Sequence, residues 1–304
     1  MALTVLLVVL ALVAAAFIAF WWANIVKCRR AGDARHPSRD AAPPTLLQCA
    51  IGAVTDFLDA LGVGSFATTT ALFRAFRVVP DELIPGTLNV GHTLPTIAQA
   101  FIFVAAITVE PLTLILMILA AVAGSWLGAG IVSGWSRTRV RLVMGSALIV
   151  AAFITMLRQL QVLPKGADTI GLEGFPLVLG LAGNFALGAI MPMGIGLYAP
   201  CMVLVGLLGM NAKTAFPIMM GSCAFLMPVA SARFVKNGAY SLRAALGLAL
   251  GGIPAVLVAG LLVKELPLTW VQWLVVVIAS LTGLMLIRRA LSRGEEPAPE
   301  PVFD

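Results

Sequence analysis

Apolar residues run along the chain in long segments that are separated by short polar stretches. Eight segments follow an apolar run at the N-terminus. Two of them, 45–76 and 174–209, are longer than the rest and are interrupted by glycine. The other six have the length of ordinary membrane spans, roughly 20 residues each. They cover about 83–108, 111–134, 138–161, 212–236, 240–264 and 267–289.

The first apolar run ends in Trp21 and Trp22, and the basic residues Lys27, Arg29 and Arg30 follow. Aromatic residues at an interface, followed by cations, are typical of a span that ends in the cytoplasm. The run is longer than the core of a signal peptide and no basic residue precedes it. We therefore expect a retained transmembrane helix over 1–26, although a cleaved signal peptide is the alternative.

Composition agrees with a membrane protein. Of the 304 residues, 60% are hydrophobic and 11% are charged, and the mean hydropathy is +1.01. Soluble domains are about a quarter charged. The formal net charge of +6 is explained by basic residues beside membrane spans, so nucleic acid is not an expected partner. The four cysteines have neither metal-ligand nor CxxC spacing, so the sequence does not predict a zinc or disulfide framework.

The two interrupted segments resemble each other. GVGSFATTTALFRAFRVVPDELIP, from Gly62, aligns with GIGLYAPCMVLVGLLGMNAKTAFP, from Gly194. Gly62 pairs with Gly194 and Gly64 with Gly196, at a constant offset of 132 positions. Glycine- or proline-interrupted segments at matching positions in two halves point to the binding site of a transporter. The pattern predicts two repeats, 45–161 and 174–290, joined by an extracytoplasmic loop, 162–173.

The distribution of lysine and arginine indicates how the interrupted segments cross the membrane. If each segment returns to its own side as a hairpin, 16 of the 20 basic residues are cytoplasmic. If each crosses once, only 13 are cytoplasmic. The positive-inside rule favours hairpins. A hairpin plus three spans makes an odd number of crossings, so the second repeat is expected to be inverted relative to the first.

This topology places the N-terminus outside the cell and the C-terminus in the cytoplasm. It adds a basic cytoplasmic loop, 27–44, and a Pro- and Glu-rich cytoplasmic tail, 291–304, whose composition predicts disorder. The expected fold is an all-α polytopic protein of the inner (plasma) membrane. It has two inverted repeats, each a Gly-broken hairpin plus three transmembrane helices, and an extra N-terminal helix.

The glycines suggest where a ligand binds. Non-helical backbone survives at membrane depth only inside protein or beside a wet cavity. A helix that restarts after such a break presents free N–H groups and the positive end of its dipole, which bind anions. The alternative is that the glycines only allow close packing of helices. The expected anion-binding residues are Gly62, Gly64, Ser65, Thr68, Thr69, Gly194, Gly196 and Tyr198.

Titratable and polar residues nearby suggest coupling to protons. Asp56 and Asp59 are three positions apart and share a helical face. Carboxylates within a membrane are costly and are a functional-site hypothesis by default. His92 lies in LNVGHTLP with Asn89 one turn earlier, and Ser222 lies near its counterpart in the second repeat. We expect Asp56, Asp59 and His92 as proton-coupling candidates, and Asn89, His92 and Ser222 beside the pathway. Location at the membrane surface and ordinary packing are the alternatives.

Motifs for enzymatic chemistry are absent from the sequence. It contains no G-x-x-x-x-G-K-[ST] phosphate loop, no G-x-S-x-G and no H-E-x-x-H. The methionines of MPMG and PIMM are expected to be packing residues rather than metal ligands. The prediction is therefore a protein that is not an enzyme and has no cofactor and no metal site.

Four stretches together carry a family resemblance: DALGVGSFATTT, IPGTLNVGHTLP, MGIGLYAPCMVLVGLLGMN and AFPIMMGSCAFLMP. They resemble the sulfite exporter TauE/SafE family, also called the toluene-sulfonate uptake permeases, over roughly residues 45 to 290. The resemblance implies an integral membrane protein of two repeated halves. It also implies transport of sulfite, sulfonates or related sulfur-containing anions, in either direction.

The resulting hypothesis is a secondary transporter of small sulfur-containing anions that works by alternating access and is coupled to protons. The expected partners are the anionic substrate and the lipid bilayer; a homo-oligomer is neither required nor excluded by the sequence. A passive anion channel would use the same residues without coupling. A membrane-embedded scaffold without transport would use the glycines for packing alone.

Overall fold

The computed structural model describes residues 2–31, 42–128, 137–162, 168–191, 197–265 and 267–292. Within these ranges the chain is almost entirely helical. No strand forms there, and the β-type pairing consists of a bridge between Thr169 and Met210. The expected all-α class is confirmed.

Five helical stretches are long and apolar enough to cross a membrane. They are Ala2–Lys27, Asp81–Ala106, Ala212–Asn237, Leu242–Leu262 and Trp273–Leu291. Shorter apolar helices lie at Pro111–Leu127, Gly145–Leu157, Gly174–Ile190 and Tyr198–Leu207. By length and composition the fold is that of a helical membrane protein.

Large apolar side chains on the outside of the molecule support this class. Trp22, Leu46, Phe175, Leu261 and Trp270 are each more than two-thirds exposed. These side chains come from five different helices, and exposed apolar side chains on so many helices are unusual for a soluble monomer. A lipid environment explains it, because these side chains would then face acyl chains rather than water.

Each apolar segment expected from the sequence corresponds to one or two helices, some of which extend one or two residues beyond the expected bounds. The bounds are α1 Ala2–Ala31, α2 Leu46–Ala60, α3 Ser65–Ala75, α4 Ile84–Ala106, α5 Pro111–Ala123, α7 Arg137–Gln159, α8 Gly174–Ile190, α9 Tyr198–Leu207, α10 Ala215–Asn237, α11 Leu242–Glu265 and α12 Leu268–Leu291. A π-helical turn, Gly124–Gly128, continues α5. The N-terminal helix extends past its expected end at residue 26, to Ala31.

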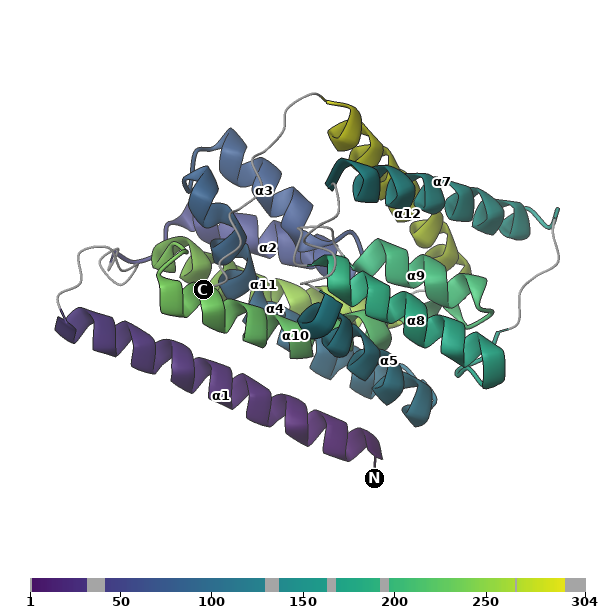
Figure 1. The fold of residues 1–304 in the computed structure, drawn as a ribbon, viewed down its shortest axis with the longest axis horizontal. Helices are drawn as coiled ribbons and strands as arrows, with labels where there is room; N and C mark the ends of the chain where they lie inside the picture. The colour runs from purple at the N-terminus through teal and green to yellow at the C-terminus, as the bar shows by residue number, and fades with distance from the viewer. Residues whose placement is uncertain are drawn as a thin grey trace.

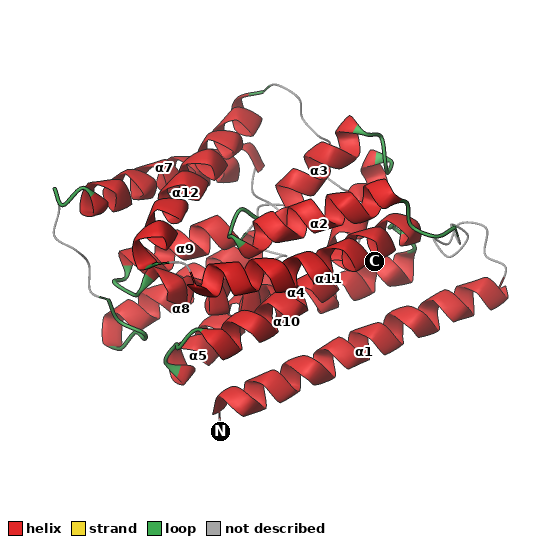
Figure 2. Cartoon of the chain, turned by 180° about the vertical axis from the view of Figure 1, so that it is seen from behind, coloured by secondary structure: helices red, strands yellow, loops and turns green. Residues whose placement is uncertain are grey.

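Both interrupted segments consist of two short helices. In the first, α2 ends at Ala60 and α3 begins at Ser65; Gly62 and Gly64 between them have φ angles of 94° and 85°. Residues with a side chain rarely adopt these angles, so glycine permits the break that the sequence predicted. Figure 2 shows α2 and α3 converging towards this loop. In the second segment α8 ends at Ile190 and α9 begins at Tyr198, and Gly194 and Gly196 lie outside the described residues.

The centre of the molecule is formed by α4 and α10, whose apolar spans are about two-thirds and three-quarters buried. Helix α11 packs on α4 and on α2, and α5 packs on α10 and on α8. Helices α7 and α12 pack mainly on each other, and both contact α9; α12 also contacts the turn Ala212–Thr214 that precedes α10. Helix α1 lies along one edge, against α10 and α4 (Figure 1), where the Trp21 indole N–H donates to the Tyr240 hydroxyl at 2.9 Å.

Two close helix crossings depend on glycine. A Cβ atom on Gly52 of α2 would overlap the backbone of Leu248 in α11, and one on Gly188 of α8 would overlap the carbonyl of Ala121 in α5. Such crossings are typical of helix packing in membranes, where small residues let backbones approach closely. Both crossings therefore fix how the interrupted hairpins sit on their neighbouring helices.

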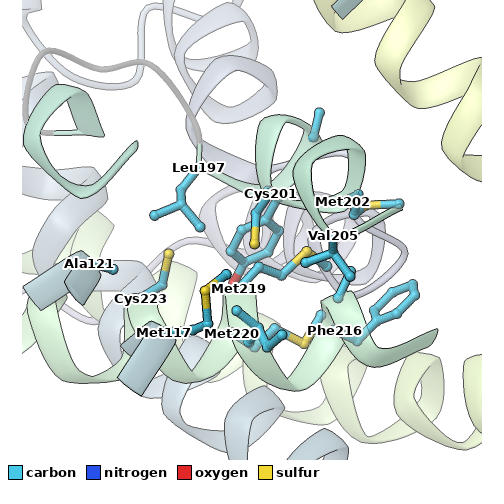
Figure 3. Packing of buried hydrophobic residues seen from close by; sticks show 14 of the residues in the cluster. Met117, Ala121, Leu197, Cys201, Met202, Val205, Phe216, Met219, Met220 and Cys223 are labelled. Atoms are coloured by element: carbon cyan, nitrogen blue, oxygen red, sulfur yellow. The ribbon is translucent and has the colours of Figure 1, made fainter. Parts of the chain in front are cut away.

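Sulfur-containing side chains fill much of the core where α9 and α10 meet α5. Figure 3 shows Cys201 and Met202 of α9 beside Met219, Met220 and Cys223 of α10, together with Met117 of α5. All six are nearly inaccessible to solvent. Met219 and Met220, from the PIMM stretch, are thus packing residues.

The crossings generate a stability prediction. The variants Gly52→Ala and Gly188→Ala should each be destabilised by about 1–3 kcal/mol, because the added methyl group forces two backbones apart. The matched control is Gly206→Ala, since a Cβ atom added there meets nothing within 4 Å. Thermal unfolding of the purified protein in detergent measures the difference. Equal melting temperatures for Gly188→Ala and Gly206→Ala would contradict this account of the crossings.

Candidate functional site

A cavity of about 130 Å³ lies where the first hairpin meets the second half of the chain. The first half contributes Asp59, Thr96 and the stretch from Val63 to Thr68. The second half contributes, among others, Leu197–Ala199, Cys223 and one face of α12. The starts of α3 and of α9 therefore line the same cavity. Its wall is mainly apolar, with a few polar groups gathered at these helix starts.

Asp59 connects the end of α2 to the start of α3. Its side chain is almost fully buried, although it lines the cavity. Oδ1 accepts a hydrogen bond from the Ser65 backbone N–H at 2.5 Å, and Oδ2 accepts one from Gln99 Nε2 at 2.9 Å. The first amides of a helix have no partner within the helix. Asp59 supplies that partner and places a carboxylate at the positive end of the α3 dipole.

A second buried acid forms a chain with His92 and Thr69. Oδ1 of Asp56 lies 2.8 Å from Nδ1 of His92, and Nε2 of His92 lies 3.0 Å from Oγ1 of Thr69. All three side chains are fully buried and come from α2, α4 and α3. An ionised carboxylate only accepts, so Nδ1 donates to it, and Nε2 can then exchange a hydrogen bond with the threonine hydroxyl in either direction. Helix α3 is thus held at Ser65 and at Thr69 by groups that can titrate.

Gln99 of α4 joins the two halves of the chain. Its Nε2 donates to Asp59, and its Oε1 accepts from the Tyr198 hydroxyl at 3.0 Å. Tyr198 is the first residue of α9 and lines the cavity. One amide side chain therefore connects the starts of α3 and α9, through Asp59 on one side and Tyr198 on the other.

Asp56 sits against a glycine of α11. Its Oδ2 is buried and has no hydrogen-bond partner. A Cβ atom on Gly252 would overlap this oxygen. Gly252 therefore provides the space in which the Asp56 carboxylate can lie in line with His92.

The polar groups could support binding and proton exchange. The order carboxylate, imidazole, hydroxyl in Asp56, His92 and Thr69 is the one that activates a nucleophile in hydrolases. Here the Thr69 hydroxyl is fully buried and Thr69 does not line the cavity, so a ligand in the cavity would not reach it. Among the described residues, no group of three or more His, Cys, Asp or Glu could hold a metal ion.

The structure brings most of the expected site residues of the first half together. Gly64, Ser65 and Thr68 line the cavity, and Gly62 precedes them in the loop. Asp59 also lines it, whereas Asp56, His92 and Thr69 lie behind this wall in a connected layer. In the second half Tyr198 lines the cavity.

Two expected residues lie elsewhere. Asn89 does not line the cavity; its side chain donates to the Pro85 carbonyl of its own helix at 2.9 Å. Ser222 is fully buried on α10, where its hydroxyl accepts from Asn184 of α8 at 3.2 Å. This places Ser222 in a link between α8 and α10 rather than in the cavity wall. The positions of Gly194 and Gly196 fall outside the described residues.

Sequence reasoning did not assign Gln99, Thr96, Cys223 or Arg289 to the site. Thr96 and Gln99 follow His92 by four and seven positions, so all three lie on one face of α4 and helical spacing could have identified them. Cys223 lines the cavity from α10, and the exposed Arg289 lines it from the last turn of α12. No local pattern marks Arg289, because only the fold brings the end of the last helix to the first hairpin.

Comparison of the chain with protein-family models, with curated proteins and with solved structures gives no match. The class therefore rests on the fold and the cavity. The chain is an α-helical protein with several apolar helices that could cross a membrane, and with a buried polar network at two broken helices.

The role of Gln99 gives a prediction. Gln99→Leu should lower stability by about 1–3 kcal/mol, because it removes the donor to a buried carboxylate oxygen and the acceptor of the Tyr198 hydroxyl. The comparison variant is Gln159→Leu, which loses a single long bond, at 3.5 Å, on the outside of α7. Thermal unfolding in detergent compares the two. If Gln99→Leu were no less stable than Gln159→Leu, the proposed link between the two helix starts would be wrong.

Proposed function

We propose that the chain is a secondary transporter of small sulfur-containing anions, such as sulfite or organosulfonates, coupled to protons. One observation carries the proposal. Two short helices, one from each half of the chain, begin at the same cavity. Transporters hold anionic groups at the N-termini of such broken helices near the middle of the membrane.

The packing of the helices supports two inverted repeats. Suppose that the helices of the first repeat, α2, α3, α4, α5 and α7, correspond in order to those of the second, α8, α9, α10, α11 and α12. The contact of α2 with α11 then has the contact of α8 with α5 as its counterpart, and both are observed. The two helices of the pair α4 and α10 are each other's counterparts, and so are α7 and α12; in both pairs the two helices are in contact. A twofold axis in the membrane plane requires such pairs to be antiparallel. Thr93 pairs with Ser231 and Phe103 stacks on Phe216, which is the antiparallel order.

The glycine crossings follow the same correspondence. In the first repeat, Gly52 of α2 packs against Leu248; in the second, Gly188 of α8 packs against Ala121. The two glycines are 136 positions apart in the sequence. Their two contact residues, Ala121 and Leu248, are 127 positions apart. A second pair agrees. A Cβ atom on Gly124 would overlap the Phe185 carbonyl, and one on Gly251 would overlap the Cys49 carbonyl, at the same two offsets. The offset of 136 positions between α2 and α8 exceeds the 132 positions found for the glycine loops by about one turn of α-helix.

The two sides of the membrane would be reached in turn. Arg289, an exposed residue of the cavity wall, lies on the side where the positive-inside rule places the cytoplasm. A second hollow, of about 200 Å³, is lined by residues that include Thr108 and Lys213, on the side expected to be outside. Movement of one repeat against the other would expose the site alternately, as in other inverted-repeat transporters.

The chemistry of the substrate rests on the resemblance to the sulfite exporter family and on the cavity itself. The amides at the start of α3 would donate to an oxyanion, and the hydroxyl groups of Ser65, Thr68 and Tyr198 lie on the same wall. The Thr68 hydroxyl donates to the Ser65 carbonyl and the Tyr198 hydroxyl donates to Gln99, so both would have to turn towards the ligand on binding. The apolar wall, with Phe66 and Met227, would accept the organic part of a sulfonate. Cys223 adds a polarisable group on the same wall.

Transport by purified protein in liposomes tests the function. Radiolabelled sulfite should enter in a saturable manner, and an imposed pH gradient should drive it. Sulfite flux that is independent of the pH gradient would favour a passive anion channel. No flux of sulfite or of sulfonates from folded, inserted protein would contradict transport and favour a membrane-embedded scaffold.

A glycine substitution tests the site. Gly64→Val should abolish flux while the protein still inserts, because Gly64 has a φ of +85° that a β-branched residue does not adopt and lies in the cavity wall. The control is Gly206→Val, in α9, where an added side chain meets open space. Undiminished sulfite flux in Gly64→Val would remove the cavity from the transport path.

A further inference from the structure

The position that an anion would take at the start of α3 is already occupied by an anionic group of the protein. The Asp59 carboxylate accepts the hydrogen bond of the Ser65 amide, at the end of the helix where negative charge is stabilised. The sequence alone predicted free amides at this place for a substrate. In the structure, Asp59 holds the first of them.

The cavity reaches the same amide from its open side. All residues from Val63 to Thr68 line it, so the whole first turn of α3 borders the space in which a ligand would lie. Asp59 lines it as well and is nearly inaccessible to solvent. An oxyanion bound at this turn would have an ionised carboxylate as its immediate neighbour. Two negative charges repel strongly where little water screens them.

We propose that Asp59 is a tethered competitor of the substrate, and that a substrate anion replaces it at the start of α3 only when Asp59 takes up a proton. This inference rests on the proposed function and specifies how the same site is coupled. Neutral Asp59 holds the Ser65 amide less strongly, because its bond to that amide is no longer charge-assisted, and it no longer repels the anion, so the anion can displace it. Each anion therefore binds together with one proton, which returns to solution when the anion leaves. The step forms no covalent bond.

Other titratable groups surround Asp59, and their positions make them less suited to this role. Asp56 of α2 and His92 of α4 are engaged with each other and do not line the cavity. Tyr198 of α9 and Cys223 of α10 line it, but both are neutral in ordinary conditions. Arg289 of α12 is an exposed cation in the cavity wall, so its charge would attract an anion rather than oppose it. Asp59 is thus the acid whose charge directly opposes an anion in the described wall of the cavity.

The test measures anion binding to the full-length protein in detergent by isothermal titration calorimetry. The probe is methanesulfonate, which keeps a single negative charge from about pH 5 to about pH 8, so any pH dependence belongs to the protein. Wild-type affinity should rise as the pH falls, by up to about tenfold per pH unit, since one proton is bound with each anion. Repeating the titration in buffers of different ionisation enthalpy should show uptake of about one proton per anion.

The deciding variant is Asp59→Asn, which keeps the shape of the side chain and removes its charge. It should bind methanesulfonate with an affinity that changes less than about twofold over the same pH range. The matched control is Asp81→Asn, an exposed acid that pairs with Arg74 at 3.0 Å, and it should keep the wild-type pH dependence. If Asp59→Asn does not fold, the number of protons that the wild-type protein takes up per bound anion is the deciding measurement.

Several results would overturn the inference. They are an Asp59→Asn variant with the wild-type pH dependence, a wild-type protein that takes up no proton with the anion, and loss of binding at every pH in folded Asp59→Asn. Sulfite flux into liposomes without any methanesulfonate binding would also overturn it, while transport itself would stand. Absence of both binding and flux in the wild-type protein would instead contradict the proposed function.

Discussion

Backbone polar groups that leave helical geometry inside a membrane must find partners within the protein, and this constraint organises the site. At the first break, the chain turns through two glycines, and the Asp59 carboxylate satisfies the first amide of the new helix. That carboxylate needs a second donor, which Gln99 supplies. Gln99 in turn accepts from Tyr198, the first residue of the other short helix described here. A continuous chain of hydrogen bonds therefore runs from the Ser65 amide through Asp59 and Gln99 to Tyr198, and it joins the two halves of the chain.

The same constraint explains why charge occurs in so apolar a chain. Asp56 and Asp59 lie one turn apart on the buried face of α2, and each meets a partner from α4. Close crossings at glycine bring α11 against α2, and Gly252 leaves room for the second oxygen of Asp56. The position of a buried polar side chain on α2 therefore depends on a glycine of α11. Substituting these glycines should disturb the site even though they do not line the cavity.

Much of the fold could be predicted from the sequence because apolar length is a direct consequence of bilayer thickness. The ends of α4, α10, α11 and α12 agree with the expected spans to within about three residues. The break at Gly62 and Gly64 was predictable because glycine alone tolerates their backbone angles. These features depend on neighbouring residues in the chain, which a sequence displays directly.

The partners of the site residues depend on contacts between distant segments, and the sequence did not reveal them. The expectation of free amides at the start of α3 overlooked Asp59, because the loop geometry that turns its side chain back to Ser65 has no sequence signature of its own. Ser222 was expected beside the pathway because it lies near the counterpart of His92 in the second repeat, yet it pairs with Asn184 away from the cavity. Arg289 reaches the first hairpin through the tertiary packing of α12, which contacts α9 and lines the same cavity as the start of α3.

The central claim is that an oxyanion binds where α3 and α9 begin. Crystals of the protein grown with selenite, which resembles sulfite and contains a strong anomalous scatterer, test this most directly. We expect an anomalous peak within hydrogen-bonding distance of the first turn of α3, close to Ser65 and Tyr198, and weakening of that peak when sulfite competes. Peaks confined to other parts of the molecule, or a cavity without selenium at saturating selenite, would contradict it.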